Sequence, residues 1–563
     1  MTRIDWVVLC IWLVSIVGYG LWRGRRSRTV SQYLLAGKTM PWYAMGLSIM
    51  ATQASAITFI STTGQAYVDG MRFVQFYFGL PFAMVVLSAT AVPIFHRARV
   101  YTAYEYLERR FDSRTRALVT CVFLIQRGLA AGISLYAPAV ALSVILGWPD
   151  RLTTLLMGGL VVLYTTMGGI KAVTWADVQQ MSVILGALVL ALVVALRLLP
   201  PDVSFTDALS VAGAAGRLNP VVLHFDWNDR YNVWSGLIGG MFLALAYFGT
   251  DQSQVQRYLT GKSVGQSRLS LLFNAMAKIP MQFFILFIGA MVFVLFVFAR
   301  PPITFHPVAY QKMQSAPEYP DLQARYNQAW QQRSDAARRV IATRSGAEDG
   351  AAKANFQQAQ KKFDSIRTEA RSLAARVQGE RSFNDTNYIF LSFVTTYLPI
   401  GVVGLIIGVI FSAAMSSISG EINSLATVSV IDVYRRHVRR QASDRHYLWV
   451  SRAATAFWGI YAVIFASIGG SGFGALIETV NVVGSLFYGG MLGVFVLAFF
   501  FPRVGARGAF WGVLAGEAVI FLAWKFTPVA FLWYNVIGCL VVILAGVAVS
   551  AMTGEEVKHA GAE

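Results

Sequence analysis

Long apolar stretches separated by short polar segments run through most of the chain. About thirteen of these stretches are long enough to cross a hydrocarbon core of roughly 30 Å. They lie near residues 4–22, 40–68, 72–96, 116–146, 152–170, 176–199, 232–258, 270–299, 395–432, 447–468, 474–501, 507–525 and 529–551. Because lipid offers no hydrogen-bond partners, each span must satisfy its backbone internally as a helix. The pattern predicts an all-α polytopic membrane protein.

Two of these stretches are interrupted by small and polar residues. The first interruption is Thr52-Gln53-Ala54-Ser55-Ala56, and the second is Tyr247-Phe248-Gly249-Thr250. A helix that breaks in hydrocarbon leaves backbone groups unpaired at several kcal/mol each, unless they line a cavity or bind an ion. Paired breaks in the two halves of a chain indicate the binding site of a secondary transporter.

Composition agrees with a membrane location and predicts an orientation. Charged residues make up 13% of the 563, against about 25% in an average soluble protein. The net charge of +18 comes from basic loops, and Lys and Arg are enriched in the cytoplasmic loops of membrane proteins. Because the basic residues are scattered among loops, the charge does not predict nucleic-acid binding. These loops lie at 23–38, 96–116, 257–268, 435–452 and 503–507. Placing them inside predicts a multi-pass cell-membrane protein with its N-terminus outside and a cytoplasmic tail at 553–563.

Residues 301–387 form a polar insertion between the membrane segments 1–300 and 388–552. Apolar residues recur in it at heptad spacing. They are Leu322, Tyr326, Ala329, Ala336 and Val340, then Phe356, Ala359, Phe363, Ile366, Ala370, Leu373 and Val377. With the breaker 345–350 between the two sets, the pattern predicts an antiparallel helical hairpin outside the membrane. The alternative is a disordered insertion rich in Gln, Arg and Ala.

Several motifs together resemble one family, the sodium/solute symporters, which include sodium/glucose, sodium/proline and sodium/sialic acid transporters. The motifs are SIMATQASAITF at 48–59, TAYEYLERRF at 102–111, GGIKAVTWAD at 168–177, DQSQVQR at 251–257 and AAMSSISGEINS at 413–424. The resemblance covers about residues 1–500 apart from the insertion. It implies a leucine-transporter-type inverted repeat of five helices plus five, with extra helices at both ends.

The resemblance also implies a sodium site. Sodium is a hard cation that prefers oxygen ligands, which a helix interior offers only as hydroxyls or as carbonyls freed by a break. The positions that match the main sodium site are the carbonyls of Ala51, Ala54 and Ala413 and the hydroxyls of Ser416 and Ser417. Alternatively, the two serines merely bond the carbonyl four residues earlier.

A second sodium site is incomplete by the same comparison. Asp177, Ser416 and Ser419 match positions that hold a second ion in some members, but Gly420 stands where another serine is expected. Glu421 follows it and could compensate, or it could face the cytoplasmic side. Asp177 also has an alternative role, in which it pairs with helix-end amides.

The resemblance places a solute pocket between the two breaks. The matching positions are Gln53, Thr58, Phe73, Tyr77, Tyr247 and Phe248, with Tyr247 as an aromatic inner gate. Tyr77 and Ala244 replace hydrogen-bonding residues of the sugar transporters, which argues against a sugar cage. Lys278 matches a pocket-side lysine, although structural pairing explains it equally well.

Arg127 is a charged residue deep inside the span 116–146. At 1.5 Å per residue it lies about 16 Å from the start of that span, where charges are functional or paired. A guanidinium can grip a substrate carboxylate with two parallel hydrogen bonds. The alternative is an ion pair with a protein acid such as Glu421.

These observations predict a sodium-coupled symporter that imports a small organic solute, with a carboxylate as one candidate. Sodium is the coupling ion, and no other cofactor is expected; the expected partners are the solute, sodium and the lipid bilayer. One alternative is a proton-coupled carrier of the same fold, which Ser416 and Ser417 disfavour. Another is a receptor or sensor that signals through a separate partner. No enzyme is expected, because no nucleophile–base set or metal-ligand spacing occurs. The sequence leaves the oligomeric state open.

Overall fold

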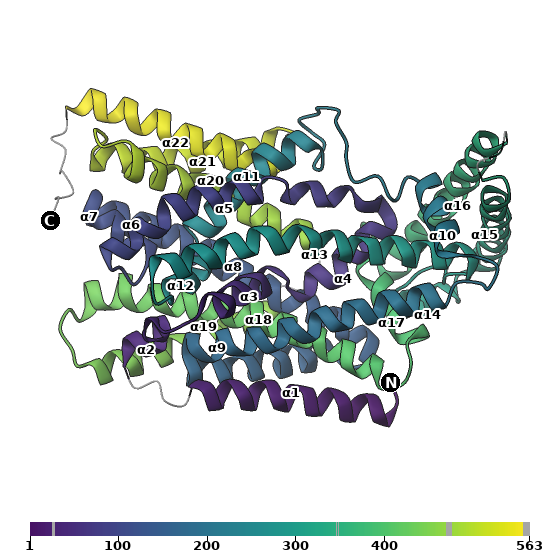
Figure 1. The fold of residues 1–563 in the computed structure, drawn as a ribbon, viewed down its shortest axis with the longest axis horizontal. Coiled ribbons are helices and arrows are strands. Elements are labelled where there is room, and N and C mark those ends of the chain that lie inside the picture. The colour runs from purple at the N-terminus through teal and green to yellow at the C-terminus, as the bar shows by residue number, and fades with distance from the viewer. Residues whose placement is uncertain (25–28, 345, 347, 469–475, 555–563) are drawn as a thin grey trace.

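The computed structural model describes residues 1–24, 29–344, 346, 348–468 and 476–554. Within these residues every regular element is a helix, and the only strand-like pairing is an isolated bridge between Met40 and Gly261. Figure 1 shows the long helices running side by side along the longest axis of the molecule. The last predicted segment, 553–563, lies outside the described residues from 555 onward.

The first half of the chain contributes elements of very different length. They are α1 Arg3–Gly24, α2 Val30–Leu35, η1 Ala36–Lys38, α3 Trp42–Gln53, α4 Ala56–Asp69, η2 Gly70–Tyr77, α5 Leu80–Ala89, α6 Ala91–Ala98, α7 Ala103–Arg110, α8 Ser113–Leu146, α9 Asp150–Arg197, α10 Phe205–Ala214, η3 Ser235–Gly239, α11 Gly240–Gly249, α12 Gln252–Leu259 and α13 Val264–Phe298.

The second half begins with the insertion and then returns to long apolar helices. Its elements are α14 Pro307–Met313, α15 Tyr319–Ala342, α16 Asp349–Gln378, η4 Thr386–Tyr388, α17 Ile389–Tyr397, α18 Val402–Val428, η5 Ser429–Val438, α19 Asp444–Ile468, α20 Leu476–Phe500, α21 Ala506–Phe526 and α22 Leu532–Thr553.

Ten helical segments of the described chain are long and apolar enough to cross a membrane. Two of the ten are compound. The segment Ala56–Ala98 contains α4, α5 and α6, and α9 is broken at Gly169, where φ is +59°. A Cβ at Gly169 would lie 2.5 Å from the carbonyl oxygen of Tyr33, so this close approach requires glycine. The predicted number of thirteen spans is not confirmed by this count.

Both predicted interruptions occur, and the second lies slightly later than expected. The chain leaves α3 after Gln53, runs extended at Ser55 and re-enters a helix at Ala56. The second break falls between α11 and α12, where Asp251 caps α12 by accepting a hydrogen bond from Ser253 N at 2.9 Å. Tyr247 and Phe248 were predicted to lie in the break but belong to the last turn of α11. Short polar caps can start a new helix immediately, so composition alone blurs the boundary.

Helix α18 forms the centre of the bundle. Almost all of its residues are buried, and it packs against α1, α8, α9 and α19. A helix that is apolar on all sides is stable only where other helices surround it. The polar residues that α18 does carry therefore lie inside the protein, where they can bond only to neighbouring helices.

The insertion contains two long helices, α15 and α16, which pack against each other and form a hairpin. Figure 1 shows them at one end of the molecule with α10 and α14 nearby. Heptad residues from both helices share one core: Leu322, Tyr326, Ala329, Phe363, Ile366, Ala370 and Leu373. Phe356, Ala337 and Val340 belong instead to the main core of the protein. Positions 345 and 347 of the predicted breaker lie outside the described residues.

Two arginines that the charge pattern assigned to loops are buried in ion pairs. Arg116 lies 2.5 Å from Glu108 and 2.6 Å from Asp432. Arg257 is 1% exposed and pairs with Asp177 at 2.7 Å. Counting either as a loop cation was wrong, because a polar helix end buried between other helices resembles a loop in composition. The remaining basic positions still carry the orientation argument.

The hairpin core allows a direct test of stability. Phe363→Ala should lower the free energy of unfolding of the hairpin by about 3–5 kcal/mol, because a buried ring stacked near Tyr326 is lost. Limited proteolysis of the purified protein would measure this as faster cleavage within 319–378. Lys361→Ala, at an exposed position of α16, is the matched control. Equal cleavage of both variants would contradict the packing described.

Candidate functional site

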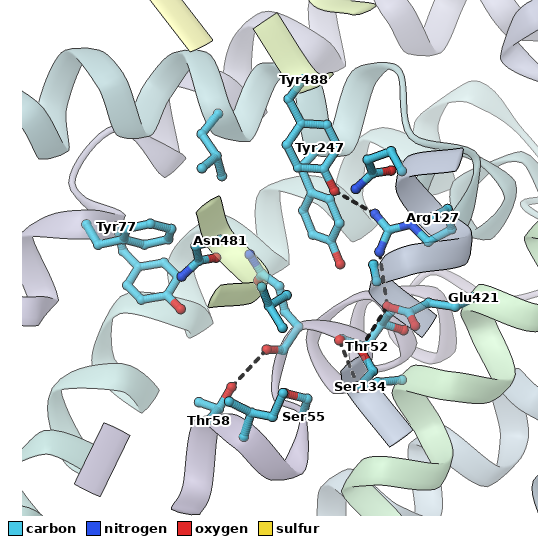
Figure 2. Close-up of a pocket in the computed structure, with 18 residues that line it drawn as sticks. Thr52, Ser55, Thr58, Tyr77, Arg127, Ser134, Tyr247, Glu421, Asn481 and Tyr488 are labelled. Carbon is cyan, nitrogen blue, oxygen red and sulfur yellow. Dashed lines mark hydrogen bonds and ion pairs between the residues drawn. The ribbon is translucent and has the colours of Figure 1, made fainter. Parts of the chain in front are cut away.

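A cavity of about 110 Å³ lies beside the first helix break. It is bounded by the α3–α4 junction, α8, α11, α18 and α20, and Figure 2 shows its labelled side chains pointing toward a common space. The predicted pocket residues that line it are Gln53, Thr58, Tyr77, Arg127 and Tyr247. Helices from early and late parts of the chain thus meet at one cavity, because α20 contributes Asn481 and Tyr488 to the wall that the α3–α4 junction begins.

Three predicted pocket residues lie behind this wall. Phe73 stacks on Phe76 with ring centroids 5.4 Å apart, and Phe248 is fully buried beside Tyr247 at 5.0 Å. Lys278 is also fully buried, and its Nζ lies 5.2 Å from the centre of the Tyr77 ring. Among the described residues this ammonium has no hydrogen-bond partner and no acid paired with it. The structural pairing proposed for Lys278 from the sequence is therefore absent from the described part of the chain.

The first break is joined to α18 by a serine hydroxyl. Ser417 Oγ lies 3.1 Å from the carbonyl oxygen of Thr52 and 3.3 Å from that of Ala413. Ala51 and Ala54 flank this contact and are buried. Three kinds of oxygen that a hard cation accepts therefore meet here: a hydroxyl, a helix carbonyl and a carbonyl freed by the break. The carbonyl that bonds Ser417 belongs to Thr52, a residue that the sequence comparison did not single out.

Ser416 faces away from this contact and toward α9. Its hydroxyl donates to Asp177 Oδ1 at 2.5 Å, while Ser48 Oγ donates to Asp177 Oδ2 at 2.5 Å. Arg257 Nη1 completes the cluster by bonding Asp177 Oδ2 at 2.7 Å and Ser48 Oγ. Asp177 is therefore neutralised by a fixed cation and does not pair with helix-end amides.

The residues predicted for a second ion are only partly brought together. Ser419 Oγ donates to the backbone carbonyl of Ser416 at 2.9 Å and does not bond Asp177. A Cβ at Gly420 would collide with Arg257 Nη2. The guanidinium thus occupies the space in which a side chain at position 420 would otherwise point. A second sodium at this cluster stays a prediction.

Arg127 is held by protein acids on two other helices. Its Nη1 lies 3.0 Å from Glu421 Oε1, and its Nη2 bonds Asp251 Oδ2. Tyr488 OH accepts from Nη2 at 2.6 Å and donates to Asp251 at 2.9 Å, and Figure 2 shows Arg127 between Tyr488 and Glu421. The ion pair with Glu421, which was the alternative interpretation of Arg127, is present in the structure. Because two carboxylates already surround this guanidinium, the contacts give no support to the interpretation in which it grips a substrate carboxylate.

Sequence reasoning missed several members of these clusters. Asp251 and Arg257 lie within the DQSQVQR motif, where an acid and a base inside a predicted span were an available signal. Ser48 starts the first motif and was not assigned a role. No local signal pointed to Tyr488, because its position depends only on how α20 packs against α8 and α11.

The family model described as Sodium:solute symporter family matches residues 33–322 and 373–516. The chain belongs to the sodium:solute symporter family. The family match confirms the resemblance drawn from the motifs. Membership in this family makes the protein a multi-pass membrane transporter that uses sodium as its coupling ion, and not an enzyme.

Relatives named for their substrates align over most of this chain. The sodium/sialic acid symporter NanT of Aliivibrio fischeri is 26% identical and aligns over 98% of this chain and 93% of its own length. The human sodium-coupled monocarboxylate transporter 1 is 27% identical over 92% of this chain and 72% of its own. A solved structure of a Na⁺-coupled sialic acid symporter, in a substrate-bound outward-open state, is 25% identical with a TM-score of 0.76. Each structure covers 98% of the other.

The Arg127 cluster predicts a strong energetic coupling between α8 and α18. Arg127→Gln should lower the free energy of unfolding by about 3–5 kcal/mol, because it leaves two buried carboxylates without their cation. Adding Glu421→Gln should restore part of the loss, with a coupling of about 0.5–3 kcal/mol. Reversible unfolding of the purified protein in mixed micelles would measure both. Glu517→Gln, on α21 and outside the cluster, should combine additively with Arg127→Gln.

Proposed function

We propose that the cavity beside the first break is the site where a small organic solute and sodium are bound together and carried inward by alternating access. The observation that carries this proposal is the joint between Ser417 and the freed carbonyl of Thr52. It joins a broken helix to the central helix of the bundle directly beside a solute-sized cavity lined by Tyr247.

Sodium binding follows from the same joint. In this proposal the sodium ligands are the hydroxyl of Ser417 and the carbonyls of Ala51, Ala54 and Ala413, and the Ser416 hydroxyl joins them after turning away from Asp177. A cation there replaces the hydrogen bonds that now hold α3 to α18 and favours the conformer in which the two helices are close. Because the solute pocket lies between the same helices, sodium and solute favour one conformer, and each raises the affinity for the other.

Tyr247 is suited to act as the gate of this cavity. Its hydroxyl accepts a hydrogen bond from Gln254 Nε2 at 2.7 Å, which links α11 to α12 across the second break. A break is a natural hinge, because few backbone bonds cross it. Movement of α11 against α12 would shift Tyr247 and open one side of the cavity. Inward release of sodium gains about 2.3 kcal/mol per charge for every 100 mV of membrane potential.

We also propose a carboxylate as the solute group, recognised by Lys278. Two of the matching relatives carry sialic acid or monocarboxylates by name. Arg127 is already neutralised, whereas Lys278 has no acid partner among the described residues, and its Nζ lies 5.2 Å from the centre of the Tyr77 ring, which lines the cavity. A buried ammonium is stable only when it is paired. Rotation of the Tyr77 ring would let a carboxylate in the cavity reach the Lys278 ammonium.

The orientation proposed from the loops places the hairpin outside and the basic loops inside, so that transport runs inward with the sodium gradient. A proton-coupled carrier gains no support from the direct contact between α3 and α18, because Ser417 and Thr52 contribute only a hydroxyl and a carbonyl to it. The one carboxylate described between the two helices, Asp177, bonds Ser48 and Ser416 and is already paired with Arg257. A sensor role likewise gains no support. Solute uptake that persists fully in sodium-free medium would select the proton-coupled alternative.

Ser417→Ala tests the ion site. The variant should need at least tenfold more sodium for half-maximal uptake, equivalent to about 1.4 kcal/mol, because one ligand is lost. The measurement is sodium-dependent stabilisation of the purified protein, with uptake into proteoliposomes as a second readout. Ser424→Ala is a matched control, since its hydroxyl only bonds the Glu421 carbonyl on the same helix at 2.7 Å. An unchanged sodium dependence of Ser417→Ala would exclude this site.

Lys278→Met tests the solute group. A panel of butyrate, butanol, butylamine and glucose should show sodium-dependent binding of butyrate, and the variant should weaken it at least tenfold while sodium binding persists. The direction follows from the loss of a cation that has no acid partner among the described residues. Lys262→Met, at an exposed position before α13, should have no effect. If an uncharged compound binds best, Lys278 is structural and the solute is not a carboxylate.

A further inference from the structure

A second cavity, of about 200 Å³, lies where the hairpin meets the membrane-spanning body. The body contributes Tyr67 and Val68 from the end of α4, Arg217 from the segment after α10, and Phe293 from α13. The remaining wall comes from α15 and α16. This junction lies at the end of the molecule that carries the hairpin in Figure 1 and is separate from the solute cavity.

Four arginines line this cavity: Arg217, Arg333, Arg367 and Arg371. Arg333 and Arg367 are 1% and 5% exposed, and Arg217 is half-buried. The Nε atoms of these three are buried without a hydrogen-bond partner. Each of these three guanidinium groups therefore leaves at least one donor unused, although a buried guanidinium would normally use most of its five donors.

Protein acids neutralise only part of this charge. Asp385 is shared, at 3.3 Å from Arg367 and 3.4 Å from Arg371. The second acid of the cavity, Asp364, accepts a hydrogen bond from Gln360 at 2.9 Å. Four guanidinium groups against these two carboxylates leave two positive charges. If the exposed Asp69 at the end of α4 is counted as a third carboxylate, one positive charge remains in excess.

The two arginines without an acid partner rely on weaker contacts. Arg333 Nη2 donates to the carbonyl of Phe296 at 2.5 Å, and its guanidinium lies 3.8 Å from the Phe363 ring centre. Arg217 donates to the carbonyl of Val68 and lies over Phe293. Within the described residues, neither forms an ion pair. Burial accordingly lowers the pKa of both Arg217 and Arg333. Arginine nevertheless remains charged in proteins, so the excess positive charge persists.

Three of the four arginines of the cavity lie in a segment that the family model does not match. The family match stops at residue 322 and resumes at 373. Arg333, Arg367 and Arg371 all lie in that gap. The family model therefore gives no account of these three arginines, and the charge excess calls for an explanation from this chain's own contacts.

We propose that this cavity binds a small oxyanion, such as a sulfate, a phosphate or a carboxylate group. The guanidinium fork matches the paired oxygens of such groups and binds them more strongly than a neutral partner. A cavity of about 200 Å³ holds an ion of that size with its contacts on several sides. Bound there, the anion would bridge the hairpin to the ends of α4 and α13, two helices of the transport core.

Equilibrium binding of radiolabelled sulfate to the purified full-length protein in detergent tests this proposal. The wild type should show saturable binding of one sulfate per chain. Arg371→Gln and Arg333→Gln should each weaken it at least tenfold. Arg339→Gln removes the same charge from an exposed position of α15 and should leave binding unchanged. The Arg371 side chain is 30% exposed, so this variant keeps the test valid if Arg333→Gln does not fold.

Competition between sulfate and other anions identifies the chemical group that the cavity binds and whether it comes from a lipid or from solution. Phosphate and acetate should displace sulfate, whereas chloride at equal ionic strength should do so only weakly. Displacement by phosphatidylglycerol in nanodiscs would assign the bound phosphate to a lipid headgroup, and displacement by free phosphate alone would assign it to a soluble anion. Absence of saturable binding in the wild type, or equal affinity in all three variants, would overturn the proposal. Neither result depends on sodium or on transport.

Discussion

Backbone groups at a helix break inside a membrane must find partners in the protein, and the architecture of this molecule follows from that constraint. The end of α3 presents freed carbonyls in a region without water, and α18 supplies the hydroxyl that bonds one of them. Ser417 meets this requirement, while its neighbours Ser416 and Ser419 bond Asp177 and a carbonyl of α18 itself. The Ser417 hydroxyl and the carbonyls that it bonds are also oxygens of the kind that a hard cation accepts. The atoms that stabilise the break are therefore suited to bind an ion as well.

Buried charges connect the helices around this break. Arg127 joins α8 to the second break through Asp251 and to α18 through Glu421, while Arg257 joins α12 to α9 through Asp177. Such pairs add little to stability compared with apolar packing, but removing one partner is strongly unfavourable. They therefore permit only conformers in which every charge keeps a partner. A transporter that alternates between two states is restricted by these pairs to a few discrete arrangements.

The hairpin contributes by a different principle. Its two helices are held together by a heptad core, and its contact with the body includes both apolar residues such as Phe356 and Val340 and a set of arginines with too few acids. Apolar contact alone would dock the hairpin in any condition. An oxyanion bound among these arginines, as proposed above, would make the docking of the hairpin depend on whether that cavity is occupied.

The sequence by itself determined the membrane class, the two helix breaks, the heptad pattern of the insertion and the family, because each depends on local periodicity or on short motifs. It also brought Gln53, Thr58, Tyr77 and Tyr247 to one pocket through the family resemblance, and it singled out Arg127 as a charge deep inside a span. Only the tertiary structure decided which charges meet. Asp251 and Glu421 lie 124 and 294 residues from Arg127 in the chain, and no local pattern records a pairing over that distance. The same packing excluded Phe73 and Phe248 from the cavity and added Tyr488, since the wall of a pocket is set by how helices lie against one another.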